Sequence, residues 1–261
     1  MITAGMDLGA QTVKAVILKD NVVLSRARCF SGFDPAQAAN QALDDALKMA
    51  NLKLPDIHYS VATGSNMELA PQAHSTVSML NADAKAGTHL FPKARTVIDV
   101  GAEEARAVKI DDKGAMLDFV VNERCAAGAG TFIEAMARAL EVNLEEMGQL
   151  SLKAERASSI NASCVIFGES DVVSLIHQQE SKAEIARAIF DALAERVASM
   201  IHVLGVNLDI VLVGGLAKDV GFVTSLSRKL SVKLLVPDYP DFAGALGAAL
   251  IASSRARSLQ K

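Results

Sequence analysis

The chain has 261 residues, of which 51% are hydrophobic, and it carries a net charge of −4 at pH 7. This length can bury one large core or two of ordinary size without the help of disulfide bonds. The acidic balance, the absence of Trp and the presence of only two Tyr exclude the basic surface and the stacking platforms that nucleic-acid binding requires.

The first part of the chain alternates strand-like and helical segments. After a strand-like amino terminus, strands are predicted at Val13–Leu18, Val22–Leu24 and Asp56–Thr63. Pro35–Ala50 predicts a helix, because its apolar residues recur at helical spacing behind Asp34 as the N-cap. The last of these strands ends in Thr63-Gly64-Ser65, a loop that is suited to a position near a ligand. Residues 66–92 predict one or two helices without clear bounds.

The second part continues the same alternation. Strands are predicted at Thr96–Val100, Ala105–Ile110, Met116–Val121, Asp209–Val213 and Val232–Val236. Helical periodicity begins at Thr131 and returns in Lys182–Leu204, whose apolar residues form one stripe. A helix is also expected over Phe242–Ala252, and its apolar core, Ala243–Ala252, is too short for a membrane span. Strands that alternate with helices indicate an α/β protein.

Two segments of the chain repeat one pattern of fourteen residues, 92 residues apart. Asp7–Asp20 (DLGAQTVKAVILKD) and Asp99–Asp112 (DVGAEEARAVKIDD) agree at six positions. Each begins with an Asp-x-Gly-Ala bend after an apolar run and continues into a strand-like run, which predicts a hairpin. The repeat suggests two related half-domains, which we place at residues 1–92 and 93–261, with the C-terminal helix free to pack back on the first half.

The two bends are suited to hold the phosphates and the metal ion of a nucleotide. Backbone N–H groups near Gly9 and Gly101 can approach phosphate oxygens closely, because no Cβ intervenes. Asp7 and Asp99 can hold Mg²⁺, directly or through its water ligands. Taken singly, each bend is equally typical of an ordinary Asp-Gly hairpin, and it is the repeat that favours a functional role.

Three glycine-containing segments fit the same hypothesis to different degrees. Gly214-Gly215 follows a predicted strand and would let the backbone approach a base or ribose, although strand-to-helix turns often use Gly. Ala126–Thr131, which contains Gly128 and Gly130, enters a helix and is suited to an anionic oxygen. It is neither a Walker A loop nor a dinucleotide-binding fingerprint. Gly244–Gly247 is better explained by close helix packing.

The three cysteines divide into a pair and a single residue. Cys125 and Cys164 each lie at or just before a predicted helix, where the helix dipole favours a thiolate or an anionic cluster. Cys29 lies in a strand-like segment and is interpreted as a small buried hydrophobic residue. Burial is the alternative for the pair as well. If the pair ligates metal, two thiols are too few for a closed four-thiolate site, so a second, similar chain would supply the other two.

Five segments together carry a resemblance to a known family over essentially the whole chain. They are Asp7–Lys14, Asp99–Glu104, Arg124–Phe132 (RCAAGAGTF), Ser163–Ser170 (SCVIFGES) and Val213–Ala217 (VGGLA). The chain resembles the ATPases that activate 2-hydroxyacyl-CoA dehydratases and the ATP-binding subunits of benzoyl-CoA reductase. The resemblance implies the actin/hexokinase/Hsp70-like fold, with two RNase H-like halves around a nucleotide cleft. It also implies a [4Fe-4S] cluster shared between two subunits, with Cys125 and Cys164 as the ligands from this chain.

Two departures from the activator pattern direct the interpretation toward the reductase. Dehydratase activators usually have Gly-Gly-Gln-Asp where this chain has Gly101-Ala102-Glu103-Glu104, and Ser-Thr where it has Ala10-Gln11-Thr12. The second bend resembles that of the smaller of the ATP-binding subunits of benzoyl-CoA reductase. We therefore expect an oxidoreductase component of anaerobic aromatic degradation that couples ATP hydrolysis to electron transfer. The homodimeric activator of a 2-hydroxyacyl-CoA dehydratase is the alternative.

The resemblance and the bends assign expected roles to individual residues. Asp99 or Glu104 would orient the attacking water. Contacts with ATP and Mg²⁺ are expected from Asp7, Gly9, Ala10, Gln11, Thr12, Lys14, Gly101, Ala102, Glu103, Gly128, Gly130, Gly214 and Gly215. Lys14 could equally be a solvated surface residue, and which of Glu103 and Glu104 serves the metal or the water is left open.

The expected partners follow from the same resemblance. They are a related ATPase subunit that shares the cluster, subunits that reduce an acyl-CoA, and ferredoxin or a similar electron donor, all in the cytoplasm. The amino terminus lacks the features of a signal peptide, which agrees with that location. A small-molecule kinase of the same fold or an actin-like filament protein would also explain the bends, but the filament protein would not explain two Gly-flanked cysteines before helices.

Overall fold

The computed structural model describes residues 1–122, 129–156, 158–161, 164–205 and 208–259, and the chain divides into two compact units. Unit 1 comprises Met1–Val97, Val108–Leu117 and Asp241–Lys261. Unit 2 comprises Ile98–Ala107 and Asp118–Pro240. The division of the chain into RNase H-like halves at residues 92 and 93 stays a prediction.

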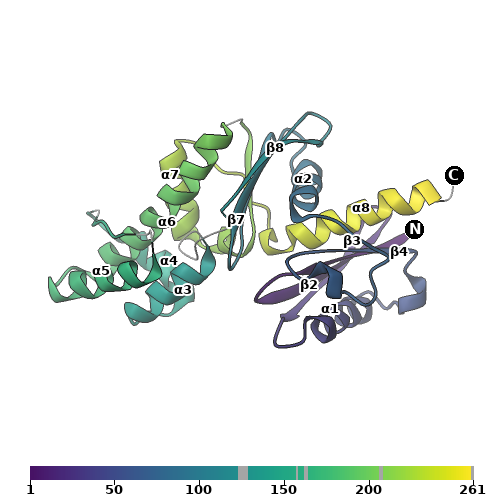
Figure 1. The fold of residues 1–261 in the computed structure, drawn as a ribbon, viewed down its shortest axis with the longest axis horizontal. Coiled ribbons are helices and arrows are strands. Elements are labelled where there is room, and N and C mark those ends of the chain that lie inside the picture. The colour runs from purple at the N-terminus through teal and green to yellow at the C-terminus, as the bar shows by residue number, and fades with distance from the viewer. Residues whose placement is uncertain (123–128, 157, 162–163, 206–207, 260–261) are drawn as a thin grey trace. The chain divides into compact units, whose positions relative to one another are not determined.

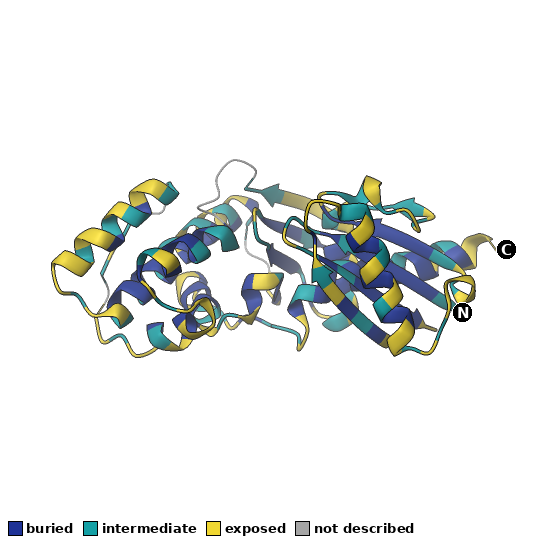
Figure 2. Cartoon of the chain, turned by 90° about the horizontal axis from the view of Figure 1, so that it is seen from below, coloured by how far each residue is buried: buried dark blue, intermediate teal, exposed yellow. Residues whose placement is uncertain are grey.

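Unit 1 is built on a five-stranded sheet in the order β3-β2-β1-β4-β5. Its strands are β1 (Ile2–Leu8), β2 (Thr12–Lys19), β3 (Val22–Phe30), β4 (Tyr59–Thr63) and β5 (Ser75–Thr76). β1, β2 and β3 form an antiparallel meander, so the first repeat is the predicted hairpin, whereas β4 runs parallel to β1. Figure 2 shows this sheet mostly in the colour of buried residues.

Helices cover both faces of this sheet (Figure 1). One face packs on α1 (Pro35–Met49), which starts as predicted with the Asp34 carboxylate accepting a hydrogen bond from Gln37 N at 3.0 Å. The other face packs on α8 (Ala243–Leu259), against which α2 (Met79–Leu90) lies. A Cβ on Gly247 would overlap the carbonyl of Ala82, which confirms close helix packing as the role of this glycine.

The second sheet has the order β8-β7-β6-β9 and carries the second bend. Its strands are β6 (Thr96–Val100), β7 (Ala105–Ile110), β8 (Met116–Val121) and β9 (Ile210–Val213). The described helices of unit 2 are α3 (Gly130–Ala139), α4 (Leu144–Ser151), α5 (Val165–His177), α6 (Lys182–Leu204) and α7 (Val220–Leu230). They enclose one large apolar core, in which Phe132, Phe190 and Phe222 are fully buried. Short 3-10 helices lie at Leu54–Asp56, Met67–Leu69, Gly215–Lys218 and Pro240–Phe242.

Two strand predictions needed correction. Val232–Val236 is not a strand, because only Leu235 pairs there, in an isolated parallel bridge to Val211. The strand predicted at Asp56–Thr63 begins at Tyr59, because Leu54–Asp56 forms a 3-10 turn in which the Asp56 carboxylate accepts a hydrogen bond from Lys53 N.

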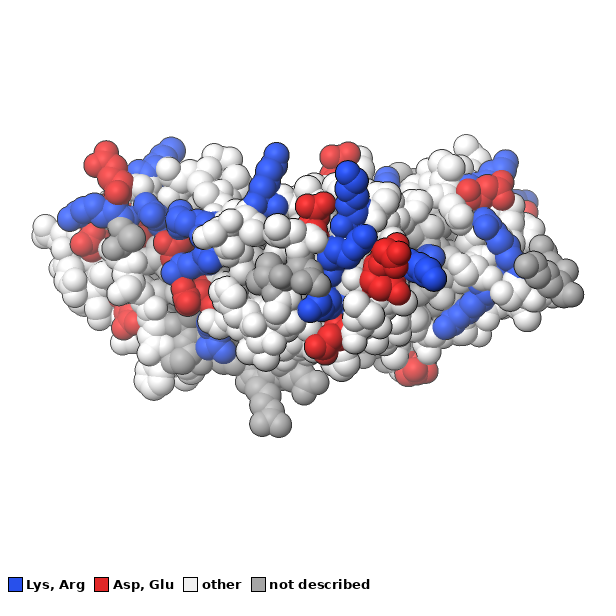
Figure 3. Space-filling view, turned by 90° about the horizontal axis from the view of Figure 1, so that it is seen from above, with Lys and Arg blue, Asp and Glu red and all other residues white. Residues whose placement is uncertain are grey.

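Two surface properties complete the description. Among the described residues, no helix combines the length and the apolarity that crossing a membrane requires. On the face drawn in Figure 3, basic and acidic side chains are interspersed over the described residues. This mixture agrees with the small net charge of the sequence.

Candidate functional site

The first bend places a carboxylate beside an ammonium group. Asp7 near the end of β1 and Lys14 in β2 are partners in the antiparallel register, so their side chains share one face of the sheet. Lys14 Nζ lies 3.4 Å from Asp7 Oδ2, and both side chains are 15% exposed. Ser31, directly after β3, holds the bend, since its N–H and its hydroxyl donate to the carbonyls of Gln11 and Gly9 at 2.9 and 2.7 Å. Lys14 is therefore a largely buried residue paired with Asp7, and its contact with a nucleotide stays a prediction.

The second bend repeats this arrangement in unit 2. Gly101 N donates to Glu104 O at 2.9 Å and closes the turn between β6 and β7. Arg106 in β7 is 8% exposed; it donates to Glu104 Oε1 at 2.6 Å and forms an ion pair with the Asp99 carboxylate. Arg106 follows Lys14 by 92 residues, so each repeat pairs its aspartate with a cation seven residues later. Sequence reasoning missed Arg106, although the repeat spacing could have found it.

A glycine lies against the aspartate of each bend. Gly214 has a φ of 91°, and a Cβ there would overlap the Asp99 carboxylate, so only glycine fits between β9 and this acid. A Cβ on Gly244, in the first turn of α8, would lie 3.1 Å from Asp7 Oδ2. Gly215 differs, because a Cβ at this residue would meet no atom within 4 Å. Gly215 thus leaves open space where a ligand can approach the backbone.

The remaining predicted contact residues of the bends are accessible to a ligand. They are half-buried, except for Gln11 and Glu103, which are exposed: Gly9, Ala10, Gln11, Thr12, Gly101, Ala102 and Glu103. Glu104 differs from Glu103 in that Arg106 holds its carboxylate. The structure thus distinguishes the two glutamates, one held by a buried cation and one facing solvent.

The N-terminus of α3 is hydrogen-bonded to the second bend. Gly130 N donates to Gly101 O at 2.9 Å, and Thr131 N donates to Ala102 O at 2.8 Å. These two N–H groups are therefore engaged within unit 2, and a contact between Gly130 and a nucleotide stays a prediction. Gly128 lies outside the described residues. The two hydrogen bonds from Gly130 and Thr131 link the second bend directly to α3, the helix that follows the predicted Cys125 motif.

The thiol groups differ in their surroundings. Cys164 is half-buried and is the N-cap residue of α5, which packs on α3: a Cβ on Gly168 would lie 3.0 Å from the ring of Phe132. Cys125 lies outside the described residues. Cys29 is half-buried and not fully buried as predicted, because β3 is an edge strand; its Sγ donates to Ala38 O at 3.2 Å. Burial, followed by the charge of Asp45, raises the pKa of the Cys29 thiol.

The chemistry of these donors fits the groups expected from the sequence. Among the described residues, no three His, Cys, Asp or Glu side chains converge on one point. That a cluster would draw on Cys125 and on thiols of a second subunit stays a prediction. Cys164 supplies a thiol at the N-terminus of a 13-residue helix. Asp7 and Asp99 supply the carboxylate oxygen that Mg²⁺ prefers.

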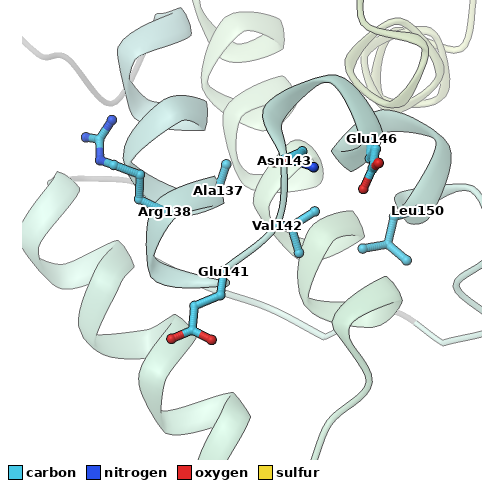
Figure 4. Close-up of a pocket in the computed structure, with 7 residues that line it drawn as sticks. All are labelled: Ala137, Arg138, Glu141, Val142, Asn143, Glu146 and Leu150. Carbon is cyan, nitrogen blue, oxygen red and sulfur yellow. The ribbon is translucent and has the colours of Figure 1, made fainter.

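A pocket lies in unit 2, where α3 meets α4. It has a volume of about 460 Å³ and is lined by Ala137, Arg138, Glu141, Val142, Asn143, Glu146 and Leu150 (Figure 4). Its lining contains charges of both signs and none of the residues predicted for the site. We assign it no function.

Comparisons with curated proteins connect this geometry to a family. The family model of the BadF/BadG/BcrA/BcrD ATPases matches residues 4–252. The activator of lactoyl-CoA dehydratase from Anaerotignum propionicum is 37% identical over 98% of this chain and 99% of its own length. A benzoyl-CoA reductase subunit from Thauera aromatica is 32% identical over 100% of this chain and 96% of its own length.

Solved structures establish the fold and complete the identification. The activator of 2-hydroxyisocaproyl-CoA dehydratase from Clostridium difficile, solved with bound ADPNP, superposes with a TM-score of 0.94 at 33% identity, covering 100% of this chain and 97% of that chain. A glucokinase from Streptomyces griseus reaches a TM-score of 0.58 at 14% identity, covering 97% of this chain and 100% of that chain, and supports the fold alone. The chain therefore has the actin/hexokinase-like ATPase fold, and it belongs to the BadF/BadG/BcrA/BcrD ATPase family.

Proposed function

We propose that this chain is the ATP-hydrolysing, electron-donating component of a cytoplasmic system that reduces an acyl-CoA. In this proposal the chain binds Mg²⁺ and ATP at its two bends. Cys125 and Cys164 share a [4Fe-4S] cluster with two thiols of a second ATPase subunit. Family membership supports the ATPase activity, and the ADPNP in the 33% identical activator supports nucleotide binding.

The two aspartate–cation pairs are the proposed phosphate and metal site. Phosphoryl transfer depends chiefly on positioning and electrostatic stabilisation, so a site needs fixed carboxylates and cations more than a covalent catalyst. Asp7 and Asp99 would hold Mg²⁺ through its waters, and Asp99 or Glu104 would orient the attacking water. Lys14 and Arg106 hold these carboxylates in defined positions. Gly215 would lie beside the adenosine.

The link between the second bend and α3 is the observation that carries the electron-transfer part of the proposal. The carbonyls of Gly101 and Ala102 accept hydrogen bonds from the first two residues of α3. α3 in turn packs against α5 through Phe132 and Gly168, and α5 begins at Cys164. A nucleotide that shifts the bend would therefore shift the helix that carries a proposed ligand thiol.

A bound cluster would supply one-electron reduction at low potential. The protein controls such potentials through hydrogen bonds to sulfur and through solvent exposure. The helices α3 and α5 would set both properties at Cys164. ATP binding and hydrolysis at the bend would then alter the surroundings of the thiols, while ferredoxin or a similar protein supplies the electron.

Two acyl-CoA partners are candidates, and different observations favour them. Identities of 37% and 33% with two dehydratase activators favour a homodimeric activator of a 2-hydroxyacyl-CoA dehydratase. The Gly101–Glu104 bend and 32% identity with the benzoyl-CoA reductase subunit favour a reductase component paired with a related ATPase chain. The first candidate predicts a cluster shared by two copies of this chain, and the second predicts a cluster shared by two different chains.

Anaerobic purification of the chain, alone and with the proteins encoded beside it, tests the proposal. A brown protein that contains iron and hydrolyses ATP supports it, and a colourless, iron-free ATPase contradicts the electron-transfer role. The subunit composition of the brown species then separates the two candidates. The decisive assay supplies 2-hydroxyacyl-CoA with its dehydratase in one reaction and benzoyl-CoA with the reductase subunits in another.

A further inference from the structure

Unit 1 contains a second ion pair on the sheet face that carries Asp7 and Lys14. Arg28 in β3 is the register partner of Lys14 in β2, just as Lys14 is the register partner of Asp7 in β1. Residues that are partners in neighbouring strands point to the same face of a sheet. Arg28 Nη1 lies 2.8 Å from Asp241 Oδ2. The two neighbouring cations of this face thus have separate carboxylate partners.

Helix α8 covers this face and begins close to both carboxylates. Val16 of β2 and Ala245 of α8 belong to one buried apolar cluster. Gly244, in the first turn of α8, lies so close to Asp7 that a Cβ would come within 3.1 Å of Oδ2. Asp241 precedes Gly244 by only three residues. The first turn of α8 therefore connects the carboxylate that Arg28 holds with the carboxylate of the first bend.

The pair of Arg28 and Asp241 differs from an ordinary surface salt bridge. The Arg28 side chain is 52% exposed, but the Asp241 side chain is only 9% exposed. Exposed ion pairs contribute little to stability, whereas a largely buried carboxylate needs its counter-charge. The chain also re-enters unit 1 at Asp241, directly after the last residue of unit 2. Because no residue of unit 1 directly precedes α8, the contact with Arg28 is suited to fix where this helix begins on the sheet.

We propose that Arg28 is a positioning residue for ATP hydrolysis. Through Asp241 it holds the first turn of α8 against Asp7, and this turn keeps the Asp7 carboxylate in one orientation at the first bend. Arg28 acts through α8 and not by contact with the nucleotide. The inference rests on the proposed function, which assigns Asp7 to the phosphate and metal site. Catalysis by positioning is sensitive to such support, because a misplacement of about 1 Å can lower a rate by about 100-fold.

Hydrogen exchange of the ligand-free, anaerobically purified protein tests the positioning step without any nucleotide. Arg28→Met should speed exchange over residues 247–250, whose N–H groups close the first turn of α8, because a helix end that loses its contacts opens more often. Lys48→Met is the matched control, since it removes a cation from an exposed pair with Asp45 on α1. Lys48→Met should leave the exchange of these amides unchanged. Equal exchange in Arg28→Met and the wild type would overturn the inference.

Steady-state ATP hydrolysis, measured below the unfolding transition of every variant, tests the consequence for the site. Arg28→Met should lower kcat by about 10–100-fold. Asp241→Asn should have the same effect, because it removes the other partner of the pair. Arg28→Lys should retain most of the wild-type rate, because an ammonium group can also reach a single carboxylate oxygen. Lys48→Met should hydrolyse ATP at the wild-type rate.

Asp7→Asn separates the inference from the proposed site. A reduced rate in Asp7→Asn, together with native rates in Arg28→Met and Asp241→Asn, would overturn the inference alone. An Arg28→Lys rate as low as that of Arg28→Met would also overturn it, since the charge would then not be what positions α8. A native rate in Asp7→Asn would contradict the proposed site, and the inference with it. Asp241→Asn tests the same pair from its other side should Arg28→Met not fold.

Discussion

Replacing Arg106 by methionine should destabilise the protein strongly. The guanidinium is 8% exposed and neutralises Asp99, which is 7% exposed, and Glu104, whose side chain is 29% exposed. Methionine fills a similar volume but leaves the Asp99 carboxylate buried without its counter-charge. Removing one partner of a buried ion pair lowers the free energy of unfolding by about 3–5 kcal/mol. Loss of the contact with the more exposed Glu104 adds about 1 kcal/mol or less. At about 2–4 °C per kcal/mol, the unfolding midpoint should fall by about 6–24 °C.

Thermal and urea unfolding, followed by circular dichroism at neutral pH, measures this loss. Lys14→Met is the matched control, because Lys14 occupies the same place in the first repeat but lies farther from its carboxylate, at 3.4 Å. Lys14→Met should cost less stability than Arg106→Met, because the attraction between charges weakens with distance. The double variant Asp99→Asn/Arg106→Met should be more stable, by about 1–3 kcal/mol, than the summed stability losses of the two single variants predict. A loss in Arg106→Met no larger than in Lys14→Met, or strict additivity in the double variant, would refute the reasoning.

Three further predictions concern activity, pH and metal. Asp99→Asn should lower ATP hydrolysis about 10²–10⁴-fold with the fold retained, and a native rate would show that the phosphate site is misplaced. The hydrogen bond from Arg156, followed by those of Glu180 and Ser181, lowers the pKa of Glu184 to about 2. The ionised Glu184 carboxylate therefore stabilises the folded protein above pH 4.5, and this stabilisation is lost as the pH falls toward 2. Glu184→Gln should be less stable than the wild type at neutral pH, and the two stabilities should become equal in acid. An iron chelator should bleach the protein and loosen the subunit pair, whereas an intact pair without iron would argue against a shared cluster.

Elements with strong local signals were predicted well. The helix Lys182–Leu204 has the predicted bounds, because a 23-residue apolar stripe starts at a capping box formed by Ser181 and Glu184. The strand Thr96–Val100 also has the predicted bounds. By contrast, the sequence did not indicate α4, a helix of eight residues. Leu235 lies in a segment with strand-like composition, yet only one residue pairs with a neighbour.

The roles of the candidate site residues stay predictions, whereas the contacts around the two bends can be compared with the sequence. The bends and their acids follow from a pattern that is visible along the chain. The pair of Arg106 and Asp99, seven residues apart, could have been found from the repeat, whereas the contact of Gly244 with Asp7 depends on helix packing across a long sequence separation. Local patterns carry no information of this kind.

The iron content of anaerobically purified cysteine variants tests the central claim most directly. The account predicts about two irons per chain in the wild type and in Cys29→Ser, since a four-iron cluster would be shared by two subunits. It predicts almost no iron in Cys125→Ser and in Cys164→Ser, because a hydroxyl is a poor substitute for a thiolate ligand. Full iron retention without Cys164, equal losses in all three variants, or four irons on an isolated monomer would contradict the account.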